Sequence, residues 1–596
     1  MQSWKEEDKH MNKFKSALEV FDRKQKRNLV YMAIMIFLQS IAELLGVTII
    51  LPFINAIVDP DALMQEPYIR WIYDMLHMDN IEQLIILLAI AIIVIYILKN
   101  LFLIYVYDLT YRFAYYGKKK MQNTLMNYYI GKDYTFFLNI NSSELIRNIN
   151  TDPEMFYTAV QNTLQLITEL VVSTLIIAYL LVKDIAITIG VAVSVGVMFL
   201  FMVKGLRKIL MRYGDERRTY SANMLKCMQQ AFGGIKEIKI ANREKYFQND
   251  FEKQNEIYTY VIKQNAFLSS IPKPIMEALC IAGLMAVIAV KVGVGNADSK
   301  QFVAILGVFA AAAFKLLPSV NKISSYFAAI VHNGVVIDKV RDEYREIHEH
   351  EKNIGLSSDG KAEETEHKII TLNNEIKVEN LEFSYPDTEV PVLSNVSIKI
   401  SKNCSAAFIG PSGAGKTTFV DLILGILTPQ KGKITVDNID IHEGMRSWHD
   451  KIGYIPQTIY MLDDTIRNNI AFGDTEEIND ERIWEALKQA QLDEFIREME
   501  DGLDTVIGEA GVRLSGGQRQ RIGIARALYR KPEVLVLDEA TSALDNETEA
   551  AVMEAIDSLQ GKMTMLIIAH RLSTIQNCDI VYKVDNGQVT VDKRKA

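Results

Sequence analysis

Residues 410–418 read Gly410-Pro411-Ser412-Gly413-Ala414-Gly415-Lys416-Thr417-Thr418, and this stretch decides how the second half of the chain folds. A strand-like apolar run precedes it at 405–409, and a helical run follows at 419–427. Its glycines let backbone N–H groups wrap around phosphates, while Lys416 would neutralise the terminal phosphates and the Thr417 hydroxyl would reach Mg²⁺. The motif and its flanks therefore predict a nucleoside triphosphate site.

A pair of acidic residues adds the chemistry of hydrolysis. The apolar run 534–537 ends in Asp538 and Glu539. A carboxylate at the end of such a strand can hold a metal ion through water, and its neighbour can polarise an attacking water molecule. We therefore expect Asp538 at the metal and Glu539 as the catalytic carboxylate.

The region around these motifs alternates between short β-branched runs and helical runs. This pattern extends from 374 to 596 and predicts a soluble α/β domain. The preceding stretch 341–373 is rich in Glu, Lys, His, Ser and Gly and lacks an apolar period, so we interpret it as a linker.

The first 340 residues have a different composition, because they hold long apolar runs of the length that crosses a bilayer. We predict a transmembrane domain over 1–340 with six spans, at about 29–57, 82–106, 158–182, 185–204, 267–293 and 301–325. The two long polar intervals, 107–157 and 205–266, keep helical apolar spacing, which indicates helices that extend beyond the membrane.

Basic residues give the orientation of these spans. Lysines and arginines gather after the second and fourth spans, at 118–120 and 208–218, whereas 59–81 has one arginine and no lysine. By the positive-inside rule, both termini and the long extensions lie in the cytosol. The extensions then turn near 138–152 and near 232–246. The net charge of -9 and the lack of a basic stripe give no indication of a nucleic-acid partner.

Two short amphipathic stretches leave alternatives open. Residues 12–24 carry apolar side chains among lysines, which fits a helix on the membrane surface or a plain solvated helix. Residues 63–78 fit a short helix at the outer interface or an ordinary loop. The four cysteines are far apart and are expected to be unpaired thiols.

The segment Leu514-Ser515-Gly516-Gly517-Gln518 is the signature motif of ABC transporters, and with 410–418 it makes the chain resemble that family. The resemblance implies that Tyr385 stacks on adenine, that Gln457 contacts the metal and that His570 senses the γ-phosphate. It implies that 542–545 is the D-loop and that 505–509 touches the membrane domain.

The resemblance also implies the architecture, that of a half-exporter of the type IV fold. Such a protein is a multidomain membrane protein with a six-helix transmembrane domain and an α/β nucleotide-binding domain. The family sandwiches ATP between the motif at 410–418 of one copy and the signature of the other. Because both halves are intact here, we expect an active ATPase that uses ATP and Mg²⁺ and works as a homodimer in the cytoplasmic (inner) membrane.

Four lysines in the predicted spans bear on the cargo, since charge inside a membrane is costly and is often functional. They are Lys99, Lys273, Lys315 and Lys322. The last two are seven residues apart, so they share a helical face about 10 Å apart along the axis. Ammonium groups facing a cavity would bind an anion such as pyrophosphate. The alternative is that some of them snorkel to lipid phosphates.

The sequence segments 271–278 and 314–326, which hold three of these lysines, resemble those of PglK-like lipid-linked oligosaccharide flippases. The resemblance implies that Lys99, Lys273, Lys315 and Lys322 engage the pyrophosphate of a polyprenyl carrier. In that family we expect arginine at these positions. The lysines of this chain keep the positive charge but lack the planar, forked guanidinium group of arginine. Glu43 is a lone acid in the first span, for which an ion pair and a structural hydrogen bond are both open.

These observations favour an ATP-driven flippase for a polyprenyl-pyrophosphate-linked oligosaccharide. A multidrug or lipid A-type exporter is the alternative, and lysines in the cavity argue against cationic drugs. An ATP-gated regulatory or channel protein is a third possibility, and the intact Glu539 weighs against it.

Overall fold

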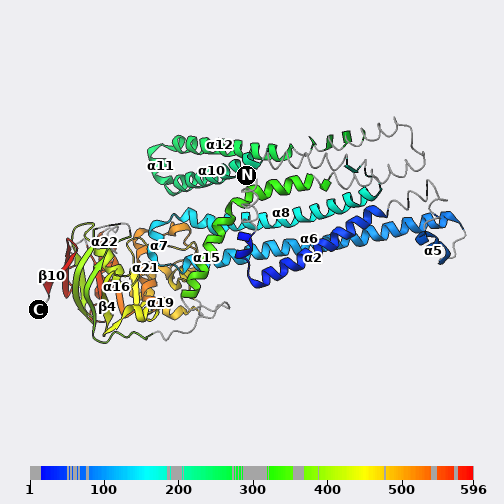
Figure 1. Cartoon of the computed structure of the whole chain (residues 1–596). Helices are drawn as coiled ribbons and strands as arrows, with labels where there is room; N and C mark the ends of the chain where they lie inside the picture. Colours follow the sequence, from blue (N-terminus) through cyan, green and yellow to red (C-terminus); the bar gives the residue numbers. More distant parts are fainter. Residues whose placement is uncertain are drawn as a thin grey trace. The chain divides into compact units, whose positions relative to one another are not determined.

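The computed structural model divides the chain into two compact units (Figure 1). The first holds 1–132 and 140–354, and the second holds 133–139 and 355–596. The described residues are 15–49, 53, 57, 64, 67–75, 80–183, 185, 188–189, 205, 207–271, 274–275, 277–278, 281–282, 285, 318–319, 321–353, 368–386, 388, 390–474, 478–538, 546–569 and 575–594.

Helices make up the described part of the first unit. In chain order they are α2 (Arg23–Thr48), α5 (Pro67–Met75), α6 (Ile81–Ile130), α8 (Ser142–Lys183), α10 (Arg207–Gly233), α11 (Ile235–Ala241), α12 (Glu244–Ser270), the short η2 (Gly334–Val336) and α15 (Ile337–Asn353). Helices α2, α6 and α8 pack against one another, and α10 packs against α12.

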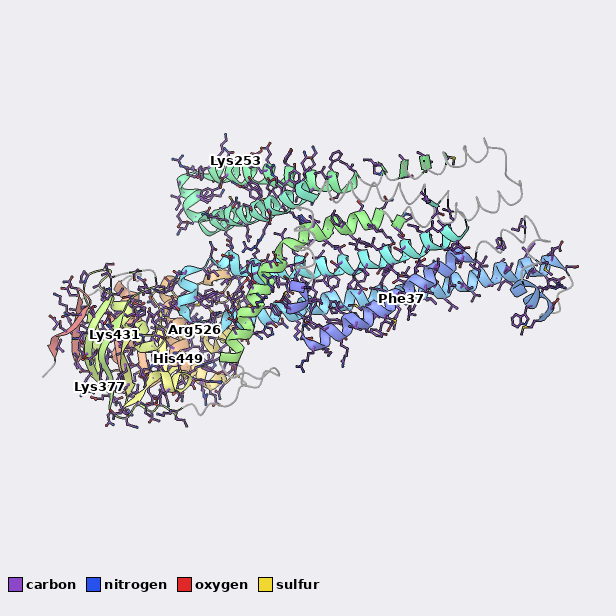
Figure 2. All side chains as sticks on the ribbon, viewed as in Figure 1. Phe37, Lys253, Lys377, Lys431, His449 and Arg526 are labelled. Carbon is purple, nitrogen blue, oxygen red and sulfur yellow. The ribbon has the colours of Figure 1, made fainter. Side chains whose placement is uncertain are left out.

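Three of these helices, α2, α6 and α8, are long and apolar enough to cross a membrane. They cover most of the first three predicted spans, whereas most of 185–204, 267–293 and 301–325 lies outside the described residues. Large apolar side chains such as Phe37 on α2 (labelled in Figure 2) and Ile90 on α6 are exposed. Apolar exposure along whole helices is what a lipid-facing surface requires.

Helix α6 is continuous over 50 residues. At 1.5 Å per residue it is about 75 Å long, well over twice the roughly 30 Å of a bilayer's hydrocarbon core. Its first half is apolar, and its second half carries Lys118, Lys119 and Lys120. One helix is therefore long enough to hold both a predicted span and one of the predicted extensions. The short α11 lies at the second predicted turning point, between α10 and α12.

The N-terminal segment packs on protein, which differs from a helix lying on a membrane surface. Residues 15–20 are helical, and Ala17, Val20 and Phe21 are buried. The Phe21 ring meets Phe113 of α6 and Phe156 of α8 edge-on, with centroids 5.6 and 5.8 Å apart. The apolar face of this segment is thus buried against α6 and α8. Aromatic pairs at this distance and angle also stabilise the contact.

The second unit is an α/β domain built on two sheets. The antiparallel sheet has the order β2-β1-β4-β5, and the larger sheet has the order β10-β9-β3-β8-β7-β6. Within the larger sheet, β9, β3, β8, β7 and β6 are parallel, and β10 is an antiparallel edge. The bounds are β1 Glu375–Phe383, β2 Leu393–Ser401, β3 Ser405–Ile409, β4 Lys431–Val436, β5 Ile439–Asp440, β6 Ile452–Ile455, β7 Val534–Asp538, β8 Thr564–Ile568, β9 Ile580–Asp585 and β10 Gln588–Arg594.

Two apolar cores hold this unit together. One joins residues of the two sheets with α16 (Lys416–Leu424), and includes Phe408, Phe419 and Trp448. The other lies under α18 (Ile466–Ala471), α19 (Asp480–Gln489) and α21 (Gly516–Tyr529). The remaining helices are α17 (Met445–His449), α20 (Asp493–Arg497), α22 (Asn546–Asp557) and the turns η3 (Ile441–Glu443), η4 (Gly502–Asp504) and η5 (Glu509–Gly511). This architecture confirms the α/β fold predicted from the sequence.

A short helix from the first half of the chain belongs to the second unit. Helix α7 (Tyr134–Asn139) lies between α6 and α8 in sequence, and it overlaps the first predicted turning point, 138–152, only at 138–139. Most of that predicted interval belongs to the first turns of α8, so the chain turns earlier than predicted. Residues 133–139 nevertheless group with the α/β domain rather than with the helices on either side of them in the chain. The segment that connects α6 to α8 is therefore part of the same compact unit as 355–596.

Candidate nucleotide-binding site

The loop 410–415 joins β3 to α16 and is shaped by its glycines. Gly410 has a φ of 151°, and a Cβ added there would clash with the carbonyl oxygen of Val584. Gly413 and Gly415 have φ values of 80° and 95°, which disfavour any L side chain. Lys416 is buried, and its Nζ donates to the carbonyl oxygens of Gly410 and Pro411 at 2.9 and 3.0 Å. The loop is thus held by the lysine that would meet the terminal phosphates.

The surface of this loop is open. Pro411, Ser412, Gly413 and Thr417 are exposed, and Ala414 and Gly415 are partly so. The loop also stands at the N-terminus of α16, where the backbone N–H groups of the first turn and the helix dipole favour an anion. This arrangement fits a nucleotide's phosphate groups.

The parallel strands bring the other predicted residues to the same edge of the sheet. Phe408 of β3 and Asp538 of β7 are both in register with Ile568 of β8. Gln457 follows β6, which is parallel to β7. Because the carboxyl ends of parallel strands meet at one edge, Asp538 and Gln457 lie at the edge that carries the phosphate loop. Carboxylate, amide and hydroxyl oxygens, the last from Thr417, are ligands that suit Mg²⁺.

A second carboxylate, which the sequence analysis missed, stands beside Asp538. Burial and the nearby charge of Asp538 raise the pKa of Asp421 on α16 to about 6. Burial, helped by Asp538 and Asp421, also raises the pKa of Tyr454. Asp421 follows Thr417 by four residues, so it shares the helical face of the metal-site hydroxyl. This spacing of four residues could have identified Asp421 from the sequence. Two carboxylates at one edge make the site strongly attractive to a divalent cation.

Tyr385 lies against another face of the loop helix. Its hydroxyl is 3.0 Å from Oγ1 of Thr418, and its ring meets Phe383 edge-on at 5.1 Å. The position is compatible with the predicted stacking on adenine, since the ring is anchored by β1 and stands next to α16.

The signature residues form the N-terminus of α21. Ser515 caps this helix and accepts a hydrogen bond from the backbone N–H of Gln518, while the Gln518 side chain accepts one from the Ser515 backbone. Leu514 and Gly517 are buried, whereas Ser515 and Gly516 are exposed. Helix α21 packs on α18 and α19, and therefore belongs to a different part of the unit from the phosphate loop. The exposed N-terminus of α21 suits a phosphate.

Several predicted residues cannot be placed. Glu539, His570 and the segment 541–545 lie outside the described residues, as do Lys273 and Lys315. Residues 505–509 are described: Val506 bridges Thr465, and Ile507 donates its N–H to the carbonyl oxygen of Asp464 at 3.1 Å.

The two described lysines of the predicted spans, Lys99 and Lys322, both have acidic partners. Nζ of Lys99 lies 2.9 Å from Oε2 of Glu43 and 4.5 Å from the Tyr96 ring centroid. Nζ of Lys322 lies 2.8 Å from Oε1 of Glu169. Glu43 therefore makes the ion pair that the sequence left as one of two options. Glu169 is not predicted from the sequence, because a contact between residues 153 positions apart cannot be inferred from spacing.

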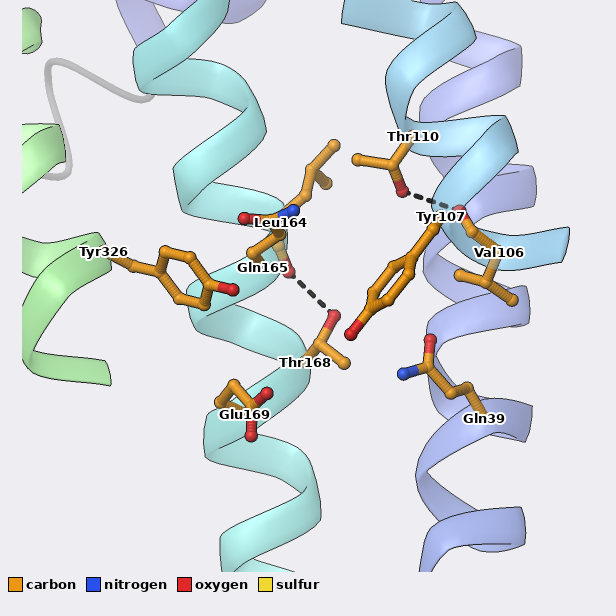
Figure 3. Close-up of a pocket in the computed structure, with 9 residues that line it drawn as sticks. All are labelled: Gln39, Val106, Tyr107, Thr110, Leu164, Gln165, Thr168, Glu169 and Tyr326. Carbon is orange, nitrogen blue, oxygen red and sulfur yellow. Dashed lines mark hydrogen bonds between the residues drawn. The ribbon is translucent and has the colours of Figure 1, made fainter. Parts of the chain in front are cut away.

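A small polar pocket lies beside the second of these ion pairs (Figure 3). Side chains of α2, α6 and α8 and of the helical stretch 321–333 line it, and Glu169 is among them. The lining residues are Gln39, Val106, Tyr107, Thr110, Leu164, Gln165, Thr168, Glu169 and Tyr326.

Comparison with known families identifies the class of protein. Residues 393–542 match the ABC transporter model, and residues 62–312 match the ABC transporter transmembrane region. Together these two matches cover most of the chain. The chain belongs to the ABC transporters, as the motifs at 410–418 and 514–518 predict.

Individual relatives refine this assignment. The chain is 44% identical over 233 residues to an ATP-dependent lipid A-core flippase of Salmonella typhimurium, and 43% identical over 235 residues to one of Escherichia coli K12. These matches cover 39% of this chain, and the chain spans 40% of the length of those relatives. A bacterial Atm1-family ABC exporter with ATP bound has the same fold, with a TM-score of 0.72, 21% identity, and coverage of 96% of this chain and 95% of that one.

Proposed function

We propose that this protein is an ATP-driven exporter that works as a homodimer and moves an anionic lipid across the cytoplasmic membrane. The observation that supports ATP use is the phosphate loop, where Lys416 is held by the carbonyls of Gly410 and Pro411. In this proposal Lys416 neutralises the terminal phosphates, Thr417 and Asp538 hold Mg²⁺, and Glu539 polarises the attacking water. Both termini and the α/β unit face the cytosol.

The homodimer follows from the two half-sites that one chain carries. The phosphate loop and the signature helix α21 are both intact, and both present a helix N-terminus to an anion. In a two-fold dimer, each phosphate loop would face the partner's signature, which gives two equivalent composite sites. ATP would join the two domains and its hydrolysis would release them.

The cargo proposal rests on the membrane ion pairs. A polyprenyl-pyrophosphate-linked oligosaccharide offers a compact anion that an ammonium group can bind inside the membrane. The accessible candidate is Lys322, whose side chain is 41% exposed. The relatives named as lipid A-core flippases support a lipid cargo, and a lipid A-type lipid is therefore the second candidate.

The test is ATP hydrolysis by the purified protein in nanodiscs, with and without a polyprenyl-pyrophosphate oligosaccharide or lipid A. We expect stimulation by the first lipid in the wild type and none in Glu539→Gln. Stimulation by lipid A alone would favour the second candidate. A folded wild-type dimer that hydrolyses no ATP would contradict the transporter mechanism.

A further inference from the structure

The two membrane ion pairs differ in how accessible their cations are. In the first pair, Lys99 and Glu43 have side chains only 11% and 5% exposed, and the Tyr96 ring covers the ammonium group. In the second, Glu169 is 10% exposed while Lys322 is 41% exposed. An incoming anion can therefore approach Lys322 from its open side, whereas Lys99 is closed off by its own helices.

The carboxylate of Glu169 also has polar surroundings apart from its lysine. Gln39 and Tyr107 enter the adjoining pocket from α2 and α6, and Tyr326 enters it from the stretch 321–333 (Figure 3). Amide N–H and phenol O–H groups donate hydrogen bonds to a carboxylate. Glu169 can thus give up Lys322 without being left in a purely apolar environment, where an unpaired charge is strongly unfavourable.

We propose that Glu169 is an exchangeable counter-ion of Lys322, which a phosphate-bearing lipid replaces. This inference rests on the proposed function and adds a specificity-determining residue to it. As an intramolecular competitor, Glu169 weakens the binding of every anion. A pyrophosphate carries more charge than a carboxylate and can displace it, whereas a fatty acid offers no gain over the carboxylate already present. The pair therefore selects phosphate lipids over carboxylate lipids.

The test measures binding of a long-chain polyprenyl pyrophosphate to the full-length dimer in nanodiscs, with ADP occupying the nucleotide site and oleate as the carboxylate competitor. We expect Glu169→Gln to bind the pyrophosphate about 5- to 10-fold more tightly, and oleate to become an effective competitor. The matched control is Glu154→Gln, which removes the same charge from the same helix at a side chain 63% exposed. It should change neither quantity.

A second variant separates the role of Glu169 from its effect on folding. Glu169→Gln/Lys322→Gln replaces the ion pair by a neutral pair and should keep the melting temperature while losing pyrophosphate binding. If this double variant binds as tightly as Glu169→Gln, Lys322 is not the ligand and the proposal is wrong. The proposal also fails if wild type binds the lipid and Glu169→Gln binds it no better.

Failure of the cargo proposal would give different binding results. Wild type that binds lipid A but no polyprenyl pyrophosphate would reject that cargo, and tighter lipid A binding by Glu169→Gln would still support the counter-ion. Wild type that binds neither anion would overturn both, while ATP hydrolysis that depends on Glu539 would leave the transporter proposal standing.

Discussion

Single glycines in the phosphate loop give the sharpest test at the scale of one residue. Gly410→Ala would drive a methyl group into the Val584 carbonyl oxygen, so the backbone must shift. Gly413 has a positive φ but nothing within 4 Å of an added Cβ. We expect Gly410→Ala to destabilise the protein by about 3 kcal/mol or more, and Gly413→Ala by about 1 kcal/mol. Thermal unfolding without nucleotide measures both, and equal losses would contradict this.

The residues of the predicted nucleotide site follow from motif spacing, which indicates the backbone and side-chain groups that would face the phosphates. The ion pairs that Glu43 and Glu169 make with lysines of the predicted spans were harder to predict from the sequence. Glu43 and Lys99 lie on different helices, as do Glu169 and Lys322. Such a contact depends on how each helix is rotated about its axis, and a single sequence does not give that rotation.

Buried polar and charged side chains join four helices of the first unit. Asp152 of α8 has a fully buried side chain, and its Oδ2 lies 3.2 Å from Nζ of Lys339 on α15 and 3.5 Å from Arg218 on α10. Asn148 of α8 donates to the Tyr129 hydroxyl of α6 at 3.0 Å. These contacts connect α6, α8, α10 and α15 outside the predicted spans.

Removing Asp152 tests this connection at the scale of the elements. Asp152→Ala leaves the cations without their shared carboxylate, and we expect a loss of about 3 to 5 kcal/mol. Thermal unfolding in nanodiscs measures this. Glu154→Ala, two residues away in an exposed pair, is the control and should cost less than about 1 kcal/mol. A small loss for Asp152→Ala would show that the helices are held by apolar packing alone.

The same cluster predicts a pH dependence. Burial raises the pKa of Glu343 on α15 to about 7, with Asp152 and Glu346 raising it further and Lys339 and the Tyr129 hydroxyl opposing the shift. A carboxyl whose pKa is higher in the folded state contributes stability that is full below its unfolded pKa and is lost as pH rises through the folded pKa. Stability should therefore fall between about pH 4.5 and pH 7.

The variant that checks this is Glu343→Gln. It should remove that part of the pH slope and stabilise the protein at pH 8 by about 2 to 3 kcal/mol, with little change at about pH 4.5. Glu349→Gln, at an exposed position of the same helix, is the control and should leave the slope intact. An unchanged slope in Glu343→Gln would rule out Glu343 as its source.

At the scale of the whole molecule, the composite site can be tested by mixing two inactive chains. Lys416→Ala damages a phosphate loop and Ser515→Ala damages a signature. In a mixed dimer, one composite site carries both lesions and the other carries neither. We expect each variant alone to lose most ATP hydrolysis, and the mixture to recover about a quarter of the wild-type rate. No recovery would contradict two composite sites that act independently.

Helix α7 offers a second test at this scale, because its residues group with the α/β unit. Tyr134 of α7 is one of the groups that raise the pKa of Tyr454, which also responds to Asp538. We expect Tyr134→Ala to keep basal ATP hydrolysis but to lose at least about half of the stimulation by lipid. Equal loss of basal and stimulated rates would contradict a role in coupling.

The large-scale fold was accessible from the sequence because its periodicities are strong. Apolar runs predict helices over α2, α6 and α8, and alternating short runs predict the α/β unit. The grouping of 133–139 with that unit was not accessible in detail, since it depends on which side chains of α7 meet a domain whose other residues begin only at 355.

The length of α6 has a mechanical consequence. A straight rod of about 75 Å that is tilted by about 5° at one end displaces its other end by about 6 Å. The Tyr157 ring of α8 packs against Gly117 of this helix and fills the space where its Cβ would be. The helix can therefore serve as a lever arm, and it leads directly into 133–139, which group with the α/β unit. A tilt of about 5° at that end is enough to move the opposite end by more than the roughly 5.4 Å of one helical turn.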